Sequence, residues 1–487
     1  MDDYLKLENH IYKNQIKDSL KVVEEYIKKN DLILTGGQAM DFSLKLKGSN
    51  IYDKYSIPDY DTISIDFYEH AKNITSILCK KGYYGVSLIP AIHLTTVRIK
   101  VSNYTVFDST FCPENVYEKV RFLNFKGIKL IHPDYQKIDQ YNSLSFLFEQ
   151  TGPTQNIYHR MEKDIKRNKL LLEYFPIENK INKIEFKKIE IPLKLIISDN
   201  YKNFGDKYFE SNDNICCHGY ISYSIYYQTI LNLYEKNKYF LDKENKKEIL
   251  SLFENIIESP FVVNNKLCSF NIPYNENIVL INGNNNIKFI EELLSKEYKN
   301  IKIETYNKLV EVKPISRIFK TNKYNFEILD LSGKLLSCNL FNFNDNNIIS
   351  SNYNYLLSYF LVQYNFGNRN DYDLQFYSSL LNIIKISNIL SNIEDIDLQQ
   401  FNYSISTYGN FNYNESIYYF VNNFNYLIEN DKNSNDKPSK IYTKFPNCNV
   451  NKEFDTSISP YFLIDGKLNN KIIKTNHIDL LKKNNLL

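Results

Sequence analysis

Hydrophobic positions near the start of the chain switch between a helical period and a strand-like one. Apolar residues recur every three or four positions over 10–29, which predicts an amphipathic helix. A short apolar run at 32–34 ends at a glycine pair, where a second helix is expected to begin. Polar and apolar residues then alternate over 59–67, 93–101 and 104–109, as in half-buried strands. These patterns predict an α/β unit with a mixed sheet.

After residue 115 the pattern becomes mainly helical, and beyond residue 180 it weakens. A short strand pair is expected near 122–131, and strand–turn–helix–strand order returns over 278–312, with Asn282-Gly283-Asn284 at the turn. Residues 429–440 are polar and of low complexity, which is typical of a loop. The remaining expected helices are 69–81, 134–150, 157–175, 353–364 and 374–391.

These patterns suggest an organisation in three parts for a chain of 487 residues. Residues 1–130 would form an α/β domain with an N-terminal helix, and 131–200 a helical segment beside it. Residues 201–487 would form a second α/β domain. The predicted fold class is therefore α/β (α+β), with a mixed sheet and flanking helices in the first domain.

Charge and composition limit the possible functions and also warn against over-reading aromatic clusters. Lys and Arg total 59 and Asp and Glu 57, so the net charge of +2 excludes binding to nucleic acid by bulk charge, although not by a local patch. The chain holds 41 Tyr and 31 Phe but only 14 Gly. Such a bias is typical of an A/T-rich genome, so clusters of Tyr or Asn carry little functional information.

The cysteines and the hydropathy indicate a reducing compartment and no membrane span. Seven cysteines are scattered without a CxxC pair or zinc-like Cys/His spacing, and no signal peptide is recognised. Cys216-Cys217-His218 is interpreted as a loop or core edge rather than a metal site, because adjacent ligands rarely reach one ion. No apolar run approaches the length of about 18 residues that spans a bilayer.

Gly36-Gly37 is the only adjacent glycine pair, and it lies where a strand meets a helix. Two residues without Cβ allow the backbone to approach a phosphate, and the helix N-terminus behind them offers free N–H groups. Taken alone, the pair is better explained by an ordinary tight turn. The pair gains weight only in combination with acidic residues later in the chain.

Carboxylates come after the glycine pair at a spacing that suits metal binding. Asp59 and Asp61 lie two positions apart on a predicted strand, so both point to one side. Asp108 ends an apolar strand nearby and supplies a third carboxylate. Paired carboxylates suit Mg²⁺ or Mn²⁺, and two such ions can hold a triphosphate and activate a hydroxyl. A solvated strand end is the alternative for each residue taken alone.

Two other Asp-x-Asp tripeptides lack this context. Asp371-Tyr372-Asp373 and Asp395-Ile396-Asp397 precede helical stretches, with no glycine turn or strand upstream, and helix capping explains them. Only the copy at 59–61 has a strand, a double glycine and a third carboxylate in order within one α/β unit. This order favours a catalytic interpretation.

The constellation resembles the catalytic layout of the DNA polymerase β-like nucleotidyltransferase superfamily. More narrowly, Tyr55-Ser-Ile-Pro-Asp-Tyr-Asp61 is similar to the poly(A) polymerase catalytic subunits of large cytoplasmic DNA viruses, of the mimivirus and asfarvirus type. The resemblance covers roughly residues 30–176. Further similar stretches are the helix from Asp66 to Lys81, His93-Leu-Thr-Thr-Val-Arg98, Ile131-His-Pro-Asp-Tyr-Gln136 and the run from Arg160 to Arg167.

The resemblance implies a template-independent poly(A) polymerase that adds AMP from ATP to RNA 3′ ends. Asp59, Asp61 and Asp108 would hold two Mg²⁺ or Mn²⁺ ions, and Asp108 would also draw the proton from the 3′-hydroxyl. Gly36 and Gly37 would contact the nucleotide phosphates. Gln38, Lys163 and Arg167 complete the expected nucleotide-binding set, although Gln38 stands where many members of the superfamily have Ser.

The resemblance also implies partners and a location. The family includes homodimers whose C-terminal half repeats the nucleotidyltransferase fold without its carboxylates, and poxvirus relatives use a methyltransferase-like processivity partner. The run at 278–312 is the expected degenerate copy here. The location would be the host cytoplasm, or the virion, of a cytoplasmic DNA virus or similar A/T-rich element.

Several assignments remain open alternatives. Lys163 and Arg167 belong to a local basic excess, but for each residue taken singly a solvated helix face with a Glu162–Lys166 pair is the better explanation. His93 and His132 are expected to support structure, whereas Tyr141 and Ser143 could lie against the adenine. A transferase with another acceptor (a tRNA end, a protein or a small molecule) and a catalytically silent scaffold subunit are the competing functions.

Overall fold

A computed structural model describes most of the chain between residues 13 and 408 and four short strands beyond it. The described residues are 13–91, 96–112, 114–146, 157–177, 183–197, 215–282, 287–306, 315–331, 336–367, 370–393, 396, 398–401, 407–408, 448–449, 453–454, 463–464 and 467–468. His93, residues 283–284 and the 429–440 stretch named above lie outside this set. No described helix is long and apolar enough to cross a membrane.

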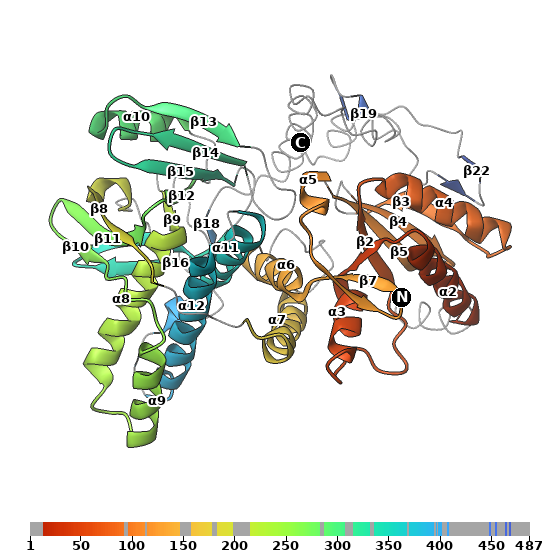
Figure 1. Ribbon diagram of the computed structural model, residues 1–487, viewed down its shortest axis with the longest axis horizontal. Helices are drawn as coiled ribbons and strands as arrows, with labels where there is room; N and C mark the ends of the chain where they lie inside the picture. The colour runs from red at the N-terminus through yellow and green to blue at the C-terminus, as the bar shows by residue number, and fades with distance from the viewer. Residues whose placement is uncertain are drawn as a thin grey trace. The chain divides into compact units, whose positions relative to one another are not determined.

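The chain divides into two compact units, each with its own mixed sheet. Unit 1 comprises the described parts of residues 1–136 and 417–487, and unit 2 those of residues 137–416. The mixed α/β class expected from the sequence is confirmed (Figure 1). Unit 1 contains α2 (Lys13–Lys29), β1 (Ile33–Thr35), α3 (Gly36–Lys45), β2 (Tyr60–Ser64), α4 (Phe67–Lys80), β3 (Ser87–Pro90), β4 (Thr96–Val101), β5 (Tyr104–Phe111), α5 (Glu114–Tyr117), β6 (Phe122–Phe125), β7 (Ile128–Ile131), β19 (Cys448–Asn449), β20 (Glu453–Phe454), β21 (Leu463–Ile464) and β22 (Lys467–Leu468).

The sheet of unit 1 is built around β2, which lies between β1 and β5. Its strand order is β22-β21-β3-β4-β5-β2-β1-β7-β6. β2 runs antiparallel to β1 and parallel to β5. The glycine turn between β1 and α3 and the Asp-x-Asp segment at the start of β2 therefore lie on neighbouring strands.

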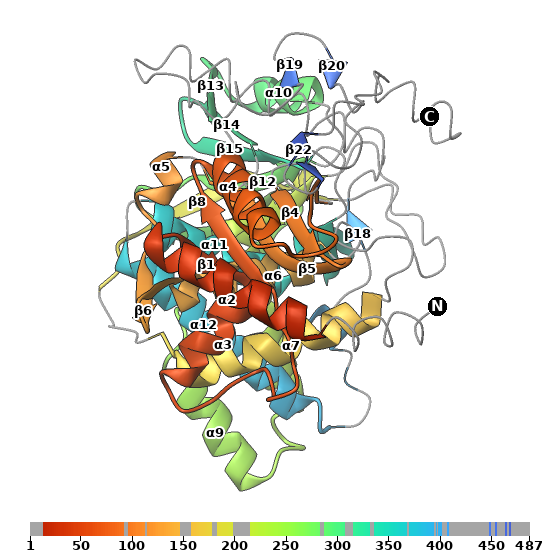
Figure 2. The same cartoon turned by 90° about the vertical axis from the view of Figure 1, so that its right-hand side faces the viewer.

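Helices α2 and α4 bury the apolar stripes that the sequence pattern predicted. Ile16, Val23 and Ile27 of α2 are each at most 1% exposed, and Ala71 and Ile74 of α4 are fully buried. Both helices pack on the central strands of the sheet and against each other, as Figure 2 shows. Their burial holds the sheet in the register that brings the acidic residues together.

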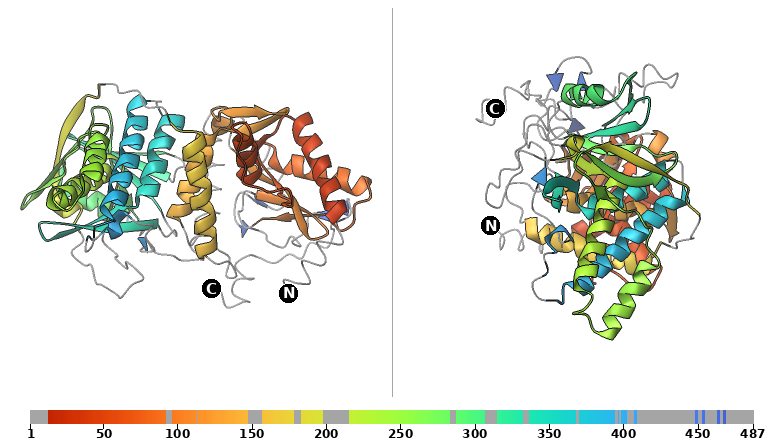
Figure 3. Two further views of the ribbon diagram at one scale, coloured as in Figure 1. Left: turned by 90° about the horizontal axis from the view of Figure 1, so that it is seen from below. Right: turned by 90° about the vertical axis from the view of Figure 1, so that its left-hand side faces the viewer.

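Unit 2 contains a second mixed sheet, a small three-stranded sheet and a layer of long helices. Helices α8, α11 and α12 pack against one another, and Figure 3 shows them side by side. Unit 2 contains most of α6 (Pro133–Ser145), followed by α7 (Ile157–Tyr174), β8 (Phe186–Pro192), the 3₁₀ turn η1 (Leu193–Leu195), β9 (Cys216–His218), α8 (Gly219–Asn237), α9 (Lys243–Phe253), β10 (Val262–Val263), β11 (Leu267–Pro273), β12 (Ile278–Asn282), α10 (Ile287–Glu297), β13 (Lys302–Tyr306), β14 (Ile315–Lys320), β15 (Asn325–Asp330), β16 (Leu336–Phe343), β17 (Asn346–Ser351), α11 (Tyr353–Phe366), α12 (Asp371–Leu390), η2 (Gln399–Phe401) and β18 (Thr407–Tyr408).

The two large sheets share one strand topology over seven positions. In unit 2 the order is β13-β14-β15-β12-β9-β17-β16, which corresponds to β3-β4-β5-β2-β1-β7-β6 in unit 1. Each of the six neighbouring pairs has the same relative direction in both sheets, including the parallel pairs β2/β5 and β12/β15. The second sheet is thus a topological repeat of the first.

The repeat begins earlier in the chain than the sequence pattern indicated. β12 takes the position of the Asp-x-Asp strand β2, and not that of the strand before the glycine turn. That earlier strand is β9, and Gly219 follows it with φ +63°, as Gly36 follows β1 with φ +65°. The Asn282-Gly283 assignment was therefore wrong, because buried strands give no alternation that distinguishes one from another.

Candidate active site

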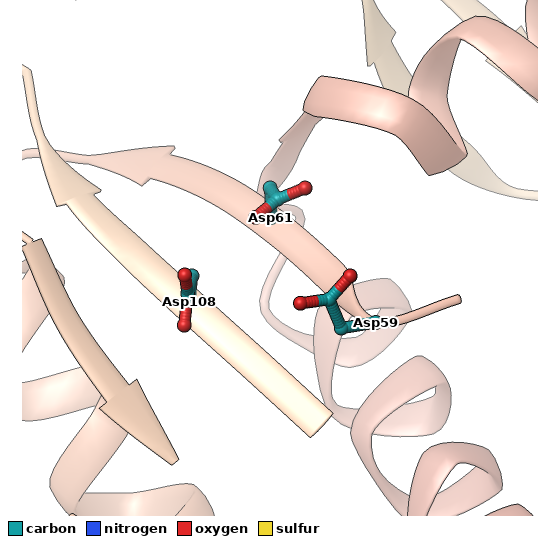
Figure 4. Close-up of side chains that lie close together, drawn as sticks. All are labelled: Asp59, Asp61 and Asp108. Carbon is teal, nitrogen blue, oxygen red and sulfur yellow. The ribbon is translucent and has the colours of Figure 1, made fainter. Parts of the chain in front are cut away.

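Three carboxylates from two adjacent strands meet on the sheet of unit 1. Asp59 immediately precedes β2, Asp61 lies within it, and Asp108 lies on β5. One carboxylate oxygen from each residue lies within 4.8 Å of the others, and Figure 4 shows the three side chains together. Asp108 is only 7% exposed, whereas Asp59 and Asp61 are partly accessible. The sequence predicted this grouping.

Strand register explains why these carboxylates converge. Asp61 is paired with Thr35 of β1 on one side and with Asp108 of β5 on the other. Asp108 is in turn paired with Arg98 of β4. The four residues therefore form one row across four neighbouring strands, with the start of α3 directly after Thr35. A shift of one residue would turn each side chain to the opposite face.

Gly36 is required by its backbone conformation and by its neighbour Asp61. Its φ of +65° lies in the left-handed region, which L-residues with a Cβ adopt only with strain. A Cβ at this position would lie 2.8 Å from Cγ of Asp61. The backbone of the β1–α3 turn therefore comes against the carboxylate site.

Gly37 and Gln38 lie in the first turn of α3, where backbone N–H groups have no partner within the helix. Both residues are buried. The Gln38 side-chain oxygen Oε1 is buried and accepts no hydrogen bond. A buried oxygen without a donor is costly, which favours a ligand or water near this turn.

The loop before Asp59 is held by two other aspartates. Buried Asp41 of α3 accepts hydrogen bonds from the backbone N–H groups of Ile51 and Tyr52, at 2.9 and 3.1 Å. Asp53 accepts from the N–H groups of Tyr55 and Ser56, at 2.9 and 2.8 Å. These bonds fix the path of the chain into the Asp-x-Asp segment, and the sequence pattern gave no sign of them.

Tyr104 closes the other side of this segment. Its hydroxyl donates to the backbone carbonyl of Ile57. Burial raises the pKa of Tyr104, and the negative charge of Asp59 raises it further. The ring is therefore close enough to the site to respond to its charge.

Arg98 contacts the carboxylate site, although sequence reasoning assigned it no role. Its Nε and Nη2 donate to Oδ1 and Oδ2 of Asp108, at 2.9 and 2.6 Å. Only the register of β4 against β5 shows this contact, because Arg98 and Asp108 lie ten residues apart across a turn.

The other predicted nucleotide contacts, Lys163 and Arg167, lie on α7 in unit 2. Lys163 is partly buried and its Nζ lies 3.7 Å from Oδ1 of Asp164. Burial lowers the pKa of Lys163, while Asp164 opposes that shift. The expected Glu162–Lys166 pair is confirmed, with an N–O distance of 2.7 Å.

Tyr141 and Ser143 were wrongly expected beside the adenine. Tyr141 is 1% exposed, and its hydroxyl bonds to that of Tyr377 at 2.8 Å. Ser143 is 6% exposed and donates to Asp164 at 2.6 Å. The side chains of Tyr141 and Ser143 pack inside unit 2, because they lie on the buried face of α6. His132 has the expected structural role, since its Nδ1 accepts from the N–H of Asp134 at the start of α6.

Cys216-Cys217-His218 is a buried strand and not a loop. These residues form β9, and each is at most 1% exposed. Burial raises the pKa of both thiols well above its ordinary value. The ring of His218 stacks on Tyr355 with centroids 4.6 Å apart, and its Nδ1 bonds to Ser351.

The chemistry of the donor set fits a divalent metal. Asp59, Asp61 and Asp108 offer only carboxylate oxygens, which are the ligands that Mg²⁺ and Mn²⁺ prefer. Among the described residues no other group of three His, Cys, Asp or Glu comes together in this way. In unit 2, the positions that correspond to Asp61 and Asp108 are Val279 and Glu327. The acidic site is thus confined to one of the two sheets.

Comparison with known proteins supports the resemblance that the sequence indicated. Residues 21–150 match the family described as "Poly(A) polymerase catalytic subunit". A candidate poly(A) polymerase catalytic subunit from African swine fever virus (isolate Pig/Kenya/KEN-50/1950) is 32% identical over 228 residues. A second relative, from Acanthamoeba polyphaga mimivirus, is 28% identical over 162 residues, which is 33% of this chain and 27% of the relative.

The similarity in sequence covers less than half of the chain, whereas the similarity in fold extends over most of it. The aligned region covers 45% of this chain and 42% of the asfarvirus relative. The crystal structure of the Megavirus polyadenylate synthase has a TM-score of 0.59 and 17% identity, and the match covers 89% of this chain and 82% of that one. Residues 21–150, which carry all three carboxylates, therefore match the poly(A) polymerase catalytic subunit family, and the chain has a fold similar to that of a viral polyadenylate synthase.

Proposed function

We propose that this chain is a template-independent poly(A) polymerase that adds AMP units from ATP to RNA 3′ ends. The observation that carries the proposal is the convergence of Asp59, Asp61 and Asp108 beside the Gly36 turn. The names of the asfarvirus and mimivirus relatives point to the same activity. Processing of mRNA is the role that such an activity would serve.

In this proposal Asp59 and Asp61 are the main ligands of two Mg²⁺ or Mn²⁺ ions, and Asp108 is a third ligand. Two bound ions would supply the positive charge that holds the triphosphate and makes a 3′-hydroxyl more acidic. The oxygen of that hydroxyl forms a bond to the α-phosphorus while the bond to the β-phosphate breaks and pyrophosphate leaves. Asp108 accepts the proton of the hydroxyl.

The backbone of the β1–α3 turn is assigned to the phosphates. Gly36 and Gly37 bring the free N–H groups of α3 close to the site, and the helix N-terminus favours negative charge. The unpartnered Gln38 oxygen is buried in the same turn, and its amide N–H₂ is the group that would donate to a phosphate. Lys163 and Arg167 supply further positive charge for the triphosphate or the RNA backbone.

We infer that unit 2 is a degenerate nucleotidyltransferase-like repeat. The support is the shared strand topology together with Val279 and Asn277 in the places of Asp61 and Asp59. Beside Gly219 a Cβ would lie 3.1 Å from Val279 and 3.3 Å from Tyr359, so apolar and aromatic side chains stand where the Asp61 carboxylate lies beside Gly36. Unit 2 would instead contribute to RNA binding or to a homodimer, and a processivity subunit is a further possible partner.

The proposed setting is the cytoplasm or the virion of a large DNA virus. The relatives named above come from such viruses. Six described cysteines are free thiols, which is typical of a reducing compartment.

Tail growth tests the proposal directly. The full chain is incubated with a labelled RNA primer, each NTP in turn, and Mg²⁺ or Mn²⁺. We expect long tails with ATP, and a loss of at least about a hundredfold in Asp59→Asn and in Asp61→Asn. Asp18→Asn is the matched control, because Asp18 is an exposed carboxylate on α2 that pairs with nearby Lys21 and not with the residues of the candidate site.

Other outcomes distinguish the alternatives. Pyrophosphate release only with a protein, tRNA or small-molecule acceptor would identify another nucleotidyltransferase. Binding of Mn²⁺ without any turnover would support a silent scaffold. Full activity in both Asp variants would contradict the assignment of the metal site.

A further inference from the structure

Arg98 is a cation built into the edge of the candidate metal site. It lies on β4 in register with Asp108 of β5. Its Nε donates to both carboxylate oxygens, at 2.9 and 3.2 Å, and its Nη2 donates to Oδ2 at 2.6 Å. The Asp108 side chain is 9% exposed and that of Arg98 32%, so water screens the pair only partly.

The charge of Arg98 reaches all three carboxylates. Its guanidinium contacts the Asp108 carboxylate, one oxygen of which lies within 4.8 Å of an oxygen of Asp59 and of Asp61. Three carboxylates within 4.8 Å of one another repel, and this one guanidinium offsets part of that repulsion. The site is therefore partly neutralised by the protein itself.

The contact also occupies the atoms that matter for metal binding. Both oxygens of Asp108 already accept hydrogen bonds from Arg98, and these same oxygens would bind an ion. A carboxylate oxygen has two lone pairs, so one oxygen can serve the guanidinium and an ion together. The ion must nevertheless share the charge of Asp108 with a fixed cation that repels it.

We propose that Arg98 is a positioning residue that holds the Asp108 carboxylate ready for a divalent ion and weakens the binding of that ion. The inference rests on the proposed function only in that this site binds Mg²⁺ or Mn²⁺. Arg98 orients the Asp108 carboxylate before the ion binds. The affinity for the ion is therefore lower, but the position of the carboxylate is fixed in advance. A simple cross-strand ion pair would also weaken the binding of the ion, but its removal would not lower the maximal rate of tail growth.

The test is Mn²⁺ binding to the full chain, measured by calorimetry without RNA or ATP. We expect Arg98→Gln to bind Mn²⁺ about tenfold more tightly than the unaltered chain, because the competing charge is removed. Without Mn²⁺ the melting temperature of this variant falls, and saturating Mn²⁺ raises it by more than in the unaltered chain. Its maximal rate of tail growth falls, while the Mn²⁺ concentration for half-maximal rate also falls.

Two further variants keep the test decisive. Lys100→Gln removes a positive charge two positions along β4, where the cross-strand partner is Thr105 and not Asp108. We expect its Mn²⁺ affinity to change less than about twofold. Arg98→Lys keeps the charge but loses the two-pronged contact, and it carries the test if Arg98→Gln does not fold. For this variant we expect an increase in affinity of about threefold, because a single mobile ammonium competes less.

The possible failures are distinguishable. If the unaltered chain binds no Mn²⁺, the metal site of the proposed function is wrong. If it binds Mn²⁺ but Arg98→Gln and Arg98→Lys bind equally or more weakly, only the role of Arg98 is wrong. An equal gain in Lys100→Gln would show a bulk charge effect and would also overturn the role of Arg98.

Discussion

The Cα of Gly36 lies so close to Asp61 that a methyl group at residue 36 would come within 2.8 Å of Cγ of that carboxylate. The backbone turn and the metal-binding carboxylate therefore occupy adjoining space. Gly36→Ala should lower the free energy of unfolding by about 1–2 kcal/mol through the left-handed φ alone, and it should also displace Asp61. We expect tail growth and Mn²⁺ affinity to fall at least about tenfold.

Gly48→Ala provides the matched control for this prediction. Gly48 has φ +81°, yet a Cβ there would meet nothing within 4 Å. Urea denaturation should show a loss of stability in both variants, larger in Gly36→Ala because its Cβ also meets Asp61, while Gly48→Ala keeps its Mn²⁺ affinity. Equal Mn²⁺ affinity in the two variants would show that a Cβ at residue 36 does not disturb the metal-binding carboxylates.

Asp108 and Glu327 occupy corresponding positions in the two sheets, and they should differ in importance. Asp108 pairs with Asp61, whereas Glu327 pairs with Val279. We expect Asp108→Asn to reduce tail growth at least about a hundredfold, and Glu327→Gln to keep the rate per folded molecule within about threefold. A comparable loss of rate in Glu327→Gln, with folding intact by circular dichroism, would show that unit 2 takes part in the chemistry.

The stability of the loop before Asp59 should depend on the hydrogen bonds that Asp41 accepts. Asp41→Ala leaves the N–H groups of Ile51 and Tyr52 without their acceptor, and each unsatisfied group costs about 1–3 kcal/mol. We expect a clear fall in the urea midpoint and a lower rate of tail growth. Asp53→Ala removes an exposed acceptor in the same loop, where water can replace it, so its midpoint should change little. The reverse order of effects would contradict this account.

Lys163 should act on ATP binding more than on turnover. Loss of one charge-assisted contact to a phosphate costs about 1.5–3 kcal/mol, so Lys163→Gln should raise the KM for ATP about tenfold or more and leave kcat nearly unchanged. Lys166→Gln is the control, because Lys166 is exposed on the same helix and pairs with Glu162. Arg167→Gln should resemble Lys163→Gln. If the KM for ATP is unchanged in both Lys163→Gln and Arg167→Gln, these residues do not contact ATP and belong to a solvated face of α7.

Asp373 should make the stability of unit 2 depend on pH. It is 1% exposed and accepts a hydrogen bond from Tyr220 at 2.7 Å. Burial raises its pKa well above the usual value, while the bond from Tyr220 opposes the shift and the charge of Glu276 adds to it. Below about pH 4 both the folded and the unfolded chain keep this proton. Above that pH the unfolded chain releases it first, so stability falls as the pH rises towards the folded pKa.

Asp373→Asn should remove this part of the pH dependence. The urea midpoint of the variant, relative to the unaltered chain, should rise as the pH increases above about 4. Asp371→Asn, in the same helical turn but exposed, should follow the unaltered chain across this range. Parallel curves for Asp373→Asn and the unaltered chain would disprove the assignment.

Local patterns predicted much of unit 1 and little of unit 2. The helix at Lys13–Lys29 has a clear apolar stripe because one face meets water. Helix α8 is buried along most of its length, including Tyr220, Tyr223 and Tyr226, so it has no polar face to reveal its period. β9 is likewise buried on both faces. Periodicity arises only where an element has one wet side.

The sequence by itself determined that Asp59 and Asp61 lie on one side of a strand and that a glycine pair stands where a strand meets a helix, because both are local patterns. Only the tertiary structure decided that Arg98 donates hydrogen bonds to Asp108, that Tyr141 is buried and that the second sheet repeats the first. Those facts depend on the register between strands and on the packing of helices far apart in the chain, where the free energy is set by partners that no local pattern identifies.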